Sequence, residues 1–148
     1  MSVFDKPLSV FDISASGLSA AKVKMGVIAS NIANAQVTET PGGGPYRRKE
    51  VQFATVLNKS MIGGSSIKDI KLNGVKIMGV KESTTPPLMV YMPGHPHADE
   101  QGFVSMPNVS ISNEMVDMIS ASRSYEANTS VISALRKMNN RALDIIRR

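Results

Sequence analysis

The C-terminal stretch, residues 112–148, decides the fold of this chain and reads SNEMVDMISASRSYEANTSVISALRKMNNRALDIIRR. It contains neither proline nor glycine, the two residues that disfavour a helix interior most strongly. Apolar or small residues recur in it at steps of three and four, the spacing of a heptad seam. The seam consists of Met115, Met118, Ser122, Tyr125, Thr129, Ile132, Leu135, Met138, Ala142 and Ile145. We predict one long helix, capped at Ser112, that packs in a coiled coil.

A second periodic stretch lies near the N-terminus and is the one obvious partner for the first. Its predicted apolar face comprises Phe11, Ala15, Leu18, Ala21, Met25, Ile28, Ile32 and Ala35. Ser9 and Asp12 resemble a capping box, so we predict a helix over about residues 10–34. Gly17 and Gly26 each cost this helix about 1 kcal/mol relative to alanine. Either a weak helix tolerates them, or neighbouring helices approach closely there.

Two asparagines, Asn31 and Asn34, lie three residues apart near the end of this helix and share a face. Their amides can cap the helix or bond to a neighbouring chain, and the spacing favours capping. Residues 40–45, Thr-Pro-Gly-Gly-Gly-Pro, then break the chain. This glycine-rich loop lacks the Lys-Ser/Thr pair and the helix that follow a phosphate-binding loop.

A short basic run, Tyr46-Arg47-Arg48-Lys49, leads into an alternating strand pattern over residues 51–57. A basic run beside an aromatic residue can mark nucleic-acid binding. This one is short and isolated, which favours a solvated strand start. Contact with an acidic surface of a neighbouring subunit is the functional alternative, and no nucleic-acid partner is expected.

The middle of the chain reads as short strands and turns. Gly63-Gly64-Ser65-Ser66 suggests a flexible link. Asn73-Gly74 separates alternating segments at residues 67–72 and 75–81, which predicts a β-hairpin turning at this dipeptide. Residues 88–92 and 102–106 are two further candidate strands.

The loop between these last strands carries four potential metal ligands, His95, His97, Asp99 and Glu100. Zinc sites usually draw their ligands from well-separated elements, and these are the only two histidines in the chain. A solvated turn is therefore the favoured interpretation, and a small metal-dependent enzyme is a distant alternative. We predict no catalytic residue, no metal ligand and no cofactor.

The composition agrees with an assembly protein rather than an enzyme. Of 148 residues only 5% are aromatic, tryptophan is absent, and ten methionines supply adaptable packing. The absence of cysteine excludes disulfide and thiolate chemistry. No apolar run approaches a membrane span, and the first residues do not read as a cleaved signal peptide.

These observations predict an α+β fold with two parts. Residues 1–35 and 110–148 are expected to form a helical coiled-coil domain. Residues 36–109 are expected to form a loop-rich and β-rich outer domain that contains a hairpin.

Several motifs resemble the flagellar axial family of rod and hook proteins. Ser30-Asn31-Ile32-Ala33-Asn34 with Thr38 is similar to the N-terminal signature of the whole family. Further runs narrow the resemblance to the C-type subunits of the proximal rod. They are residues 43–49 (GGPYRRK), 91–96 (YMPGHP), 98–99 (AD) with 102–104 (GFV), and 114–119 (EMVDMI) with 121–128 (ASRSYEAN). The resemblance covers the chain from about Leu8 to its end.

This resemblance implies a structural subunit of the bacterial flagellar basal-body rod that polymerises helically into the proximal drive shaft across the periplasm. The implied partners are copies of the chain itself, other rod subunits and the flagellar type III export apparatus. A generic helical adaptor, which binds a partner through the same amphipathic helices, is the alternative from the residues alone.

The expected assembly interface combines seam positions of both helices with the signature residues. It comprises Leu18, Met25, Ile28, Asn31, Ile32, Asn34, Thr38, Met115, Met118, Tyr125, Asn128, Ile132, Leu135, Met138 and Ile145.

Overall fold

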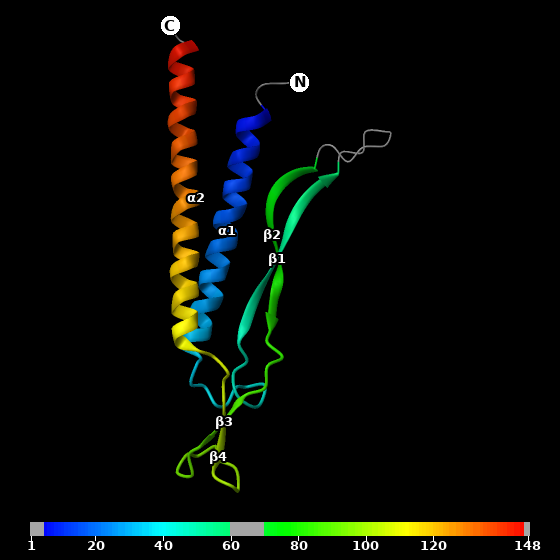
Figure 1. The fold of residues 1–148 in the computed structure, drawn as a ribbon, viewed down its shortest axis with the longest axis vertical. Coiled ribbons are helices and arrows are strands. Elements are labelled where there is room, and N and C mark those ends of the chain that lie inside the picture. The colour runs from blue at the N-terminus through cyan, green and yellow to red at the C-terminus, as the bar shows by residue number, and fades with distance from the viewer. Residues whose placement is uncertain (1–4, 60–69, 147–148) are drawn as a thin grey trace. The chain divides into compact units, whose positions relative to one another are not determined.

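The computed structural model describes residues 5–59 and 70–146. The elements follow in the order α1 (Asp5–Ala33), β1 (Lys49–Lys59), β2 (Ile70–Glu82), β3 (Leu88–Tyr91), β4 (Phe103–Met106) and α2 (Ile111–Ile146). Along the sequence, one long helix precedes and another follows a middle region built from two hairpins (Figure 1). The predicted α+β class is confirmed.

The chain falls into two compact units. The first comprises Met1–Lys22, Phe53–Met78 and Ala121–Arg148, and the second comprises Val23–Gln52 and Gly79–Ser120. Each unit contains a segment of α1, a segment of α2 and part of the long β1–β2 hairpin. The expected division into a helical domain and an outer domain stays a prediction.

Helix α1 begins at Asp5, about five residues before the predicted start. Pro7 lies in its first turn, where a missing N–H group breaks no intrahelical bond. Ser9 is inside the helix, so the capping-box role predicted for it is wrong. At the other end, Asn34 donates from Nδ2 to the Ser30 carbonyl at 2.8 Å, which confirms Asn34 as a capping residue.

Helix α2 starts two residues earlier than predicted. The Ser110 carbonyl accepts the Glu114 N–H at 3.0 Å, and the Ser110 hydroxyl lies 3.5 Å from the Asn113 nitrogen. Ser110 is therefore the N-cap, and the assignment of Ser112 is wrong. Both serines precede the same apolar pattern, so the pattern alone could not choose between them.

In the first unit the two helices meet through small side chains. Ser14, Ala20, Ala21 and Ala121 are all buried. A Cβ atom added at Gly17 would lie 3.0 to 3.2 Å from the side-chain atoms of Asn128 on α2. Of the two interpretations left open for the helix glycines, close approach is the one observed at Gly17. A Cβ added at Gly26 would meet nothing within 4 Å.

We expect Gly17→Ala and Gly26→Ala to shift stability in opposite directions, as measured by urea unfolding. Alanine at position 26 should raise the free energy of unfolding by up to about 1 kcal/mol, because it favours the helix without a clash. Alanine at position 17 should lower it, because the new methyl group displaces Asn128. Equal stabilisation by both substitutions would contradict the close approach at Gly17.

The predicted hairpin at Asn73-Gly74 is wrong. Strand β2 runs through both residues and pairs with β1, and the link that joins these strands lies in residues 60–69, outside the described residues. The predicted Gly63–Ser66 link also falls there. Gly74 instead allows β2 to approach α1, because a Cβ atom added to it would lie 2.3 Å from the Ser16 hydroxyl. That hydroxyl accepts the Val75 N–H at 3.1 Å.

Gly74→Ala should lower the free energy of unfolding by about 2 kcal/mol, because the residue has a φ of +103° and no room for a methyl group. A double-mutant cycle with Ser16→Ala separates the two causes. If the clash with Ser16 matters, Gly74→Ala will cost less in the Ser16→Ala background than in the unsubstituted chain. An equal cost in both backgrounds would assign the whole effect to backbone strain.

Strands β3 and β4 form a short antiparallel hairpin in the second unit, with Leu88 opposite Met106 and Tyr91 opposite Phe103. Both strands were predicted. The Tyr91 and Phe103 rings pack edge to face at 5.3 Å between centroids. In the connecting turn, Asp99 accepts the N–H groups of Gln101 and Phe103 on Oδ1 at 2.9 and 2.8 Å. The hairpin is therefore closed by its own polar groups.

Candidate functional site

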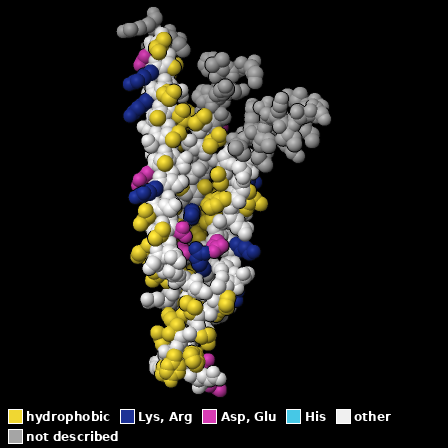
Figure 2. Space-filling view, in the orientation of Figure 1, with side chains coloured by type: hydrophobic (Ala, Val, Ile, Leu, Met, Phe, Trp, Pro, Cys, Tyr) yellow, Lys and Arg dark blue, Asp and Glu magenta, His cyan; other side chains and the backbone are white. Residues whose placement is uncertain are grey.

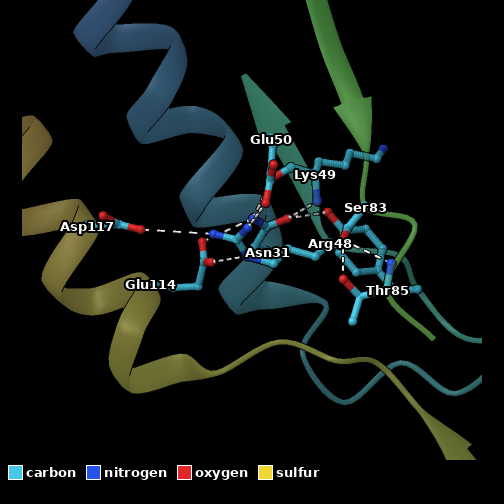
Figure 3. Close-up of polar contacts among 9 residues, drawn as sticks. Asn31, Arg48, Lys49, Glu50, Ser83, Thr85, Glu114 and Asp117 are labelled. Atoms are coloured by element: carbon cyan, nitrogen blue, oxygen red, sulfur yellow. Dashed lines mark hydrogen bonds and ion pairs between the residues drawn. The ribbon is translucent and has the colours of Figure 1, made fainter. Parts of the chain in front are cut away.

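The most constrained residue of the second unit is Asn31, near the end of α1, whose exposed fraction is 1%. Its Nδ2 donates to the Lys49 carbonyl at 2.9 Å and to Glu114 Oε2 at 3.0 Å. Its Oδ1 accepts from the Tyr46 hydroxyl and the Lys49 N–H, both at 2.9 Å. An amide offers two donors and two acceptor positions, so Asn31 is fully satisfied (Figure 3).

Glu114, in the first turn of α2, has an exposed fraction of 1%. Arg48 donates from Nε to Glu114 Oε1 at 2.7 Å, so each carboxylate oxygen of Glu114 accepts a bond. Arg48 also forms an ion pair with Glu50, and its Nη2 lies 4.0 Å from Asp117 Oδ2. A buried carboxylate is tolerated only with such compensation, because its desolvation is costly.

The charge of Arg48 is secured by the same contacts. Partial burial, the largest single cause, lowers the pKa of its guanidinium, but the hydrogen bond and the negative charge of Glu114, together with the charges of Glu50 and Asp117, raise that pKa by more. The net pKa is above the ordinary arginine value. Because the raised pKa keeps Arg48 protonated in the folded chain, the stabilising effect of its charge is fully present at every pH below the ordinary arginine pKa.

We call Asn31, Tyr46, Arg48, Lys49 and Glu114 the Asn31–Glu114 network. It joins the end of α1, the segment that leads into β1, and the start of α2. The end of β2 is tied to it through the backbone, because the Ser83 N–H donates to the Arg48 carbonyl at 2.7 Å. Figure 3 shows the side chains of Asn31, Arg48 and Glu114 converging from separate elements.

The contacts of the Asn31–Glu114 network hold its members in place. The polar groups of the network bond to one another. Across the described part of the chain, no buried side-chain nitrogen or oxygen lacks a hydrogen-bond partner. The described residues also contain no group of three or more His, Cys, Asp or Glu side chains that could hold a metal ion. The arrangement can therefore fix the relative placement of three chain segments.

The histidine loop makes structural contacts of its own. His97 bonds through Nε2 to Glu39 Oε2 and through Nδ1 to the Thr38 hydroxyl, each at 2.9 Å. His95 Nδ1 accepts the His97 N–H at 3.1 Å. These bonds connect the β3–β4 loop to the segment after α1, so His97 is not merely solvated.

The predicted interface residues divide by exposure. Ile28 and Asn31 are buried. The half-buried ones are Leu18, Met25, Ile32, Asn34, Thr38, Met118, Asn128, Ile132 and Leu135, and the exposed ones are Met115, Tyr125, Met138 and Ile145. The structure brings Asn31 to Glu114 and Gly17 to Asn128. It places Thr38 against His97. Whether these residues make contacts between copies stays a prediction.

Sequence reasoning missed the roles of Tyr46, Arg48 and Glu114. The expected solvated strand start is wrong for two residues of the basic run, because Tyr46 is buried and Arg48 pairs with acidic groups of its own chain. Capping also does not describe Asn31, whose amide bonds to Lys49 and Glu114. The one available signal was an acidic residue, Glu114, on a stretch that was expected to be a seam.

Asn31→Ala should destabilise the chain far more than Asn34→Ala, as measured by thermal or urea unfolding. The first substitution leaves Glu114 and the Tyr46 hydroxyl each short of a buried partner, which should cost about 3 kcal/mol. The second removes a single bond to the Ser30 carbonyl and should cost about 1 kcal/mol. Similar losses for the two matched substitutions would contradict the central place of Asn31.

Two family models match this chain. The family model described as "Flagella basal body rod protein" matches residues 11–39, and "Flagellar basal body rod FlgEFG protein C-terminal" matches residues 100–145. The two matches thus fall on the two terminal helices and include Asn31 and Glu114.

Relatives match nearly the whole chain. The flagellar basal-body rod protein FlgC of Borreliella burgdorferi is 40% identical, with 93% of this chain and 96% of the relative covered. The FlgC proteins of Escherichia coli O157:H7 and Bacillus subtilis are 41% and 38% identical, covering 93% and 90% of this chain and 96% and 94% of their own. With this identity over this coverage, the chain belongs to the FlgC family of flagellar basal-body rod proteins.

Proposed function

We propose that this chain is a structural subunit of the flagellar basal-body rod that polymerises helically to form the proximal part of the drive shaft. The family membership supports the structural role in the rod. The observation that supports polymerisation is that many large apolar side chains are exposed on α2 and on the β3–β4 hairpin.

Helix α2 carries large apolar side chains that its own chain leaves exposed. Ile111, Met115 and Ile119 recur at steps of four and are 38%, 53% and 57% exposed. Met138 and Ile145, seven residues apart, are 66% and 76% exposed. Figure 2 shows hydrophobic side chains along α2 and gathered on the β3–β4 hairpin. Exposed apolar patches of this kind mark interaction surfaces.

The proposed mechanism couples ordering to assembly. A helix of 36 residues gains most of its stability from packing, and α2 leaves large apolar side chains such as Met138 and Ile145 exposed. Neighbouring copies would cover the exposed apolar face and stabilise both helices. Contacts between two different surfaces add copies head to tail. When the rotation from one copy to the next does not close a ring, the copies form a helical filament.

The partners in this proposal are further copies of the chain and other rod subunits, and no nucleic acid. We further propose that the flagellar type III export apparatus delivers the chain without a cleaved signal peptide. Its proposed location is the rod within the periplasm. No helix of the described part of the chain is both long and apolar enough to cross a membrane.

Within the predicted interface, the exposed members are the strongest candidates for contacts between copies. Met115, Tyr125, Met138 and Ile145 have side-chain surface that α1 leaves uncovered. Buried members such as Ile28 and Asn31 would act through the fold of their own chain.

The proposal is tested by complementing a bacterium that lacks its own copy of this subunit. Ile145→Glu should leave the far-ultraviolet circular dichroism of the purified chain unchanged and abolish rod assembly, because it places a charge in a covered apolar contact. Ser133→Glu, also exposed on α2, is the matched control and should support assembly. Deleting residues 135–148 should abolish assembly while the β-rich middle stays folded. Completed rods with both the deletion and Ile145→Glu would refute the proposal.

A further inference from the structure

The β3–β4 hairpin carries an exposed apolar surface that its own fold does not use. Met89 and Tyr91 lie on one face of β3 and are 56% and 64% exposed, and Phe103, opposite Tyr91 on β4, is 36% exposed. Met92, which follows β3, is 41% exposed. We call these four residues of the short two-stranded hairpin the hairpin surface. Neither a short hairpin nor its turn requires such a concentration of apolar side chains.

An open groove of about 400 Å³ adjoins the hairpin surface. Met89 and Phe103 supply its apolar wall, Glu39 and Asp99 supply carboxylates, and Thr38 and His97 complete this part of the lining. The segment 88–106 contains Asp99 and Glu100 and no lysine or arginine. The occupant that fits this chemistry is therefore an apolar surface that carries positive charge.

Such a surface exists on the distal part of α2. Val131, Met138 and Ile145 are each seven residues apart and are 42%, 66% and 76% exposed. Ala134 and Arg141 fall on the same face at the intervening heptad positions, and we call these five residues the distal stripe. Over residues 131–146 the only charged residues are the basic Arg136, Lys137 and Arg141 and the acidic Asp144.

We propose that the hairpin surface of one copy of this chain binds the distal stripe of a second copy. Met138 and Ile145 cover Met89, Tyr91 and Phe103 of the hairpin surface. Arg141 enters the groove, where the carboxylates of Glu39 and Asp99 face its guanidinium. The inference rests on the proposed function, and it specifies which surfaces meet. Because the two surfaces differ, the contact adds copies head to tail.

Cysteine cross-linking tests this contact directly, since the chain has no cysteine of its own. Two differently tagged copies, one with Met89→Cys and one with Met138→Cys, are expressed together and oxidised in assembled basal bodies. A cross-link between the two tags is expected. The control pair, Met89→Cys with Met115→Cys, places the second thiol on a different exposed part of α2 and should remain uncross-linked.

Charge reversal supplies an independent test. Glu39→Lys and Arg141→Glu should each lower the yield of the cross-link about fivefold, because each brings like charges together. The two variants mixed as partners should restore it. Arg136→Glu makes the same charge change on the same helix, away from the distal stripe, and should leave the yield unchanged.

The outcomes separate this inference from the proposed function. If the cysteine variants are incorporated into rods but Met89→Cys does not cross-link to Met138→Cys, the contact between these surfaces is refuted and the rod function stands. A cross-link from Met89→Cys to a different rod protein likewise refutes the second copy as occupant. If the unsubstituted chain is not incorporated into basal bodies at all, the proposed function fails and this inference fails with it.

Discussion

The buried bond between Asn31 and Glu114 is the contact on which the second unit depends. Glu114 can be buried only because Asn31 and Arg48 each supply a donor to one of its oxygens. Arg48 reaches Glu114 only if the chain after α1 returns to the start of α2. The three segments therefore become ordered together, since omitting any one of them would leave a charge or an amide buried without its partner.

The first unit is held by a different kind of contact. There the helices meet through small residues, and Gly17 lets the backbone of α1 approach the side chain of Asn128. Such a contact buries little apolar area, so it contributes less hydrophobic stabilisation than a leucine seam would. The two units thus combine a strongly specified polar contact with a close but weakly stabilising one.

Periodicity predicted the two helices and the β3–β4 strands, because the local pattern reports which residues face a neighbour. It could not identify that neighbour. The partners Asn31 and Glu114 lie 83 residues apart in the sequence, and Arg48 and Glu114 lie 66 residues apart. Local sequence patterns therefore could not predict the network. Gly74 was misread for the same reason. A glycine needed where a strand approaches a helix has the same local signature as a glycine needed for a turn, and only Ser16 distinguishes the two.

The directionality of the bonds at Asn31 has a mechanical consequence. Apolar helix contacts tolerate small sliding because neighbouring positions of a seam are nearly equivalent, whereas four hydrogen bonds to one amide fix a single register. A shaft that transmits torque loads its subunits in shear, and shear would act to slide α1 along α2. The Asn31–Glu114 network resists that displacement at the point where the two helices also meet the strands. Torsional stiffness would then originate in a few polar groups rather than in the exposed apolar surfaces.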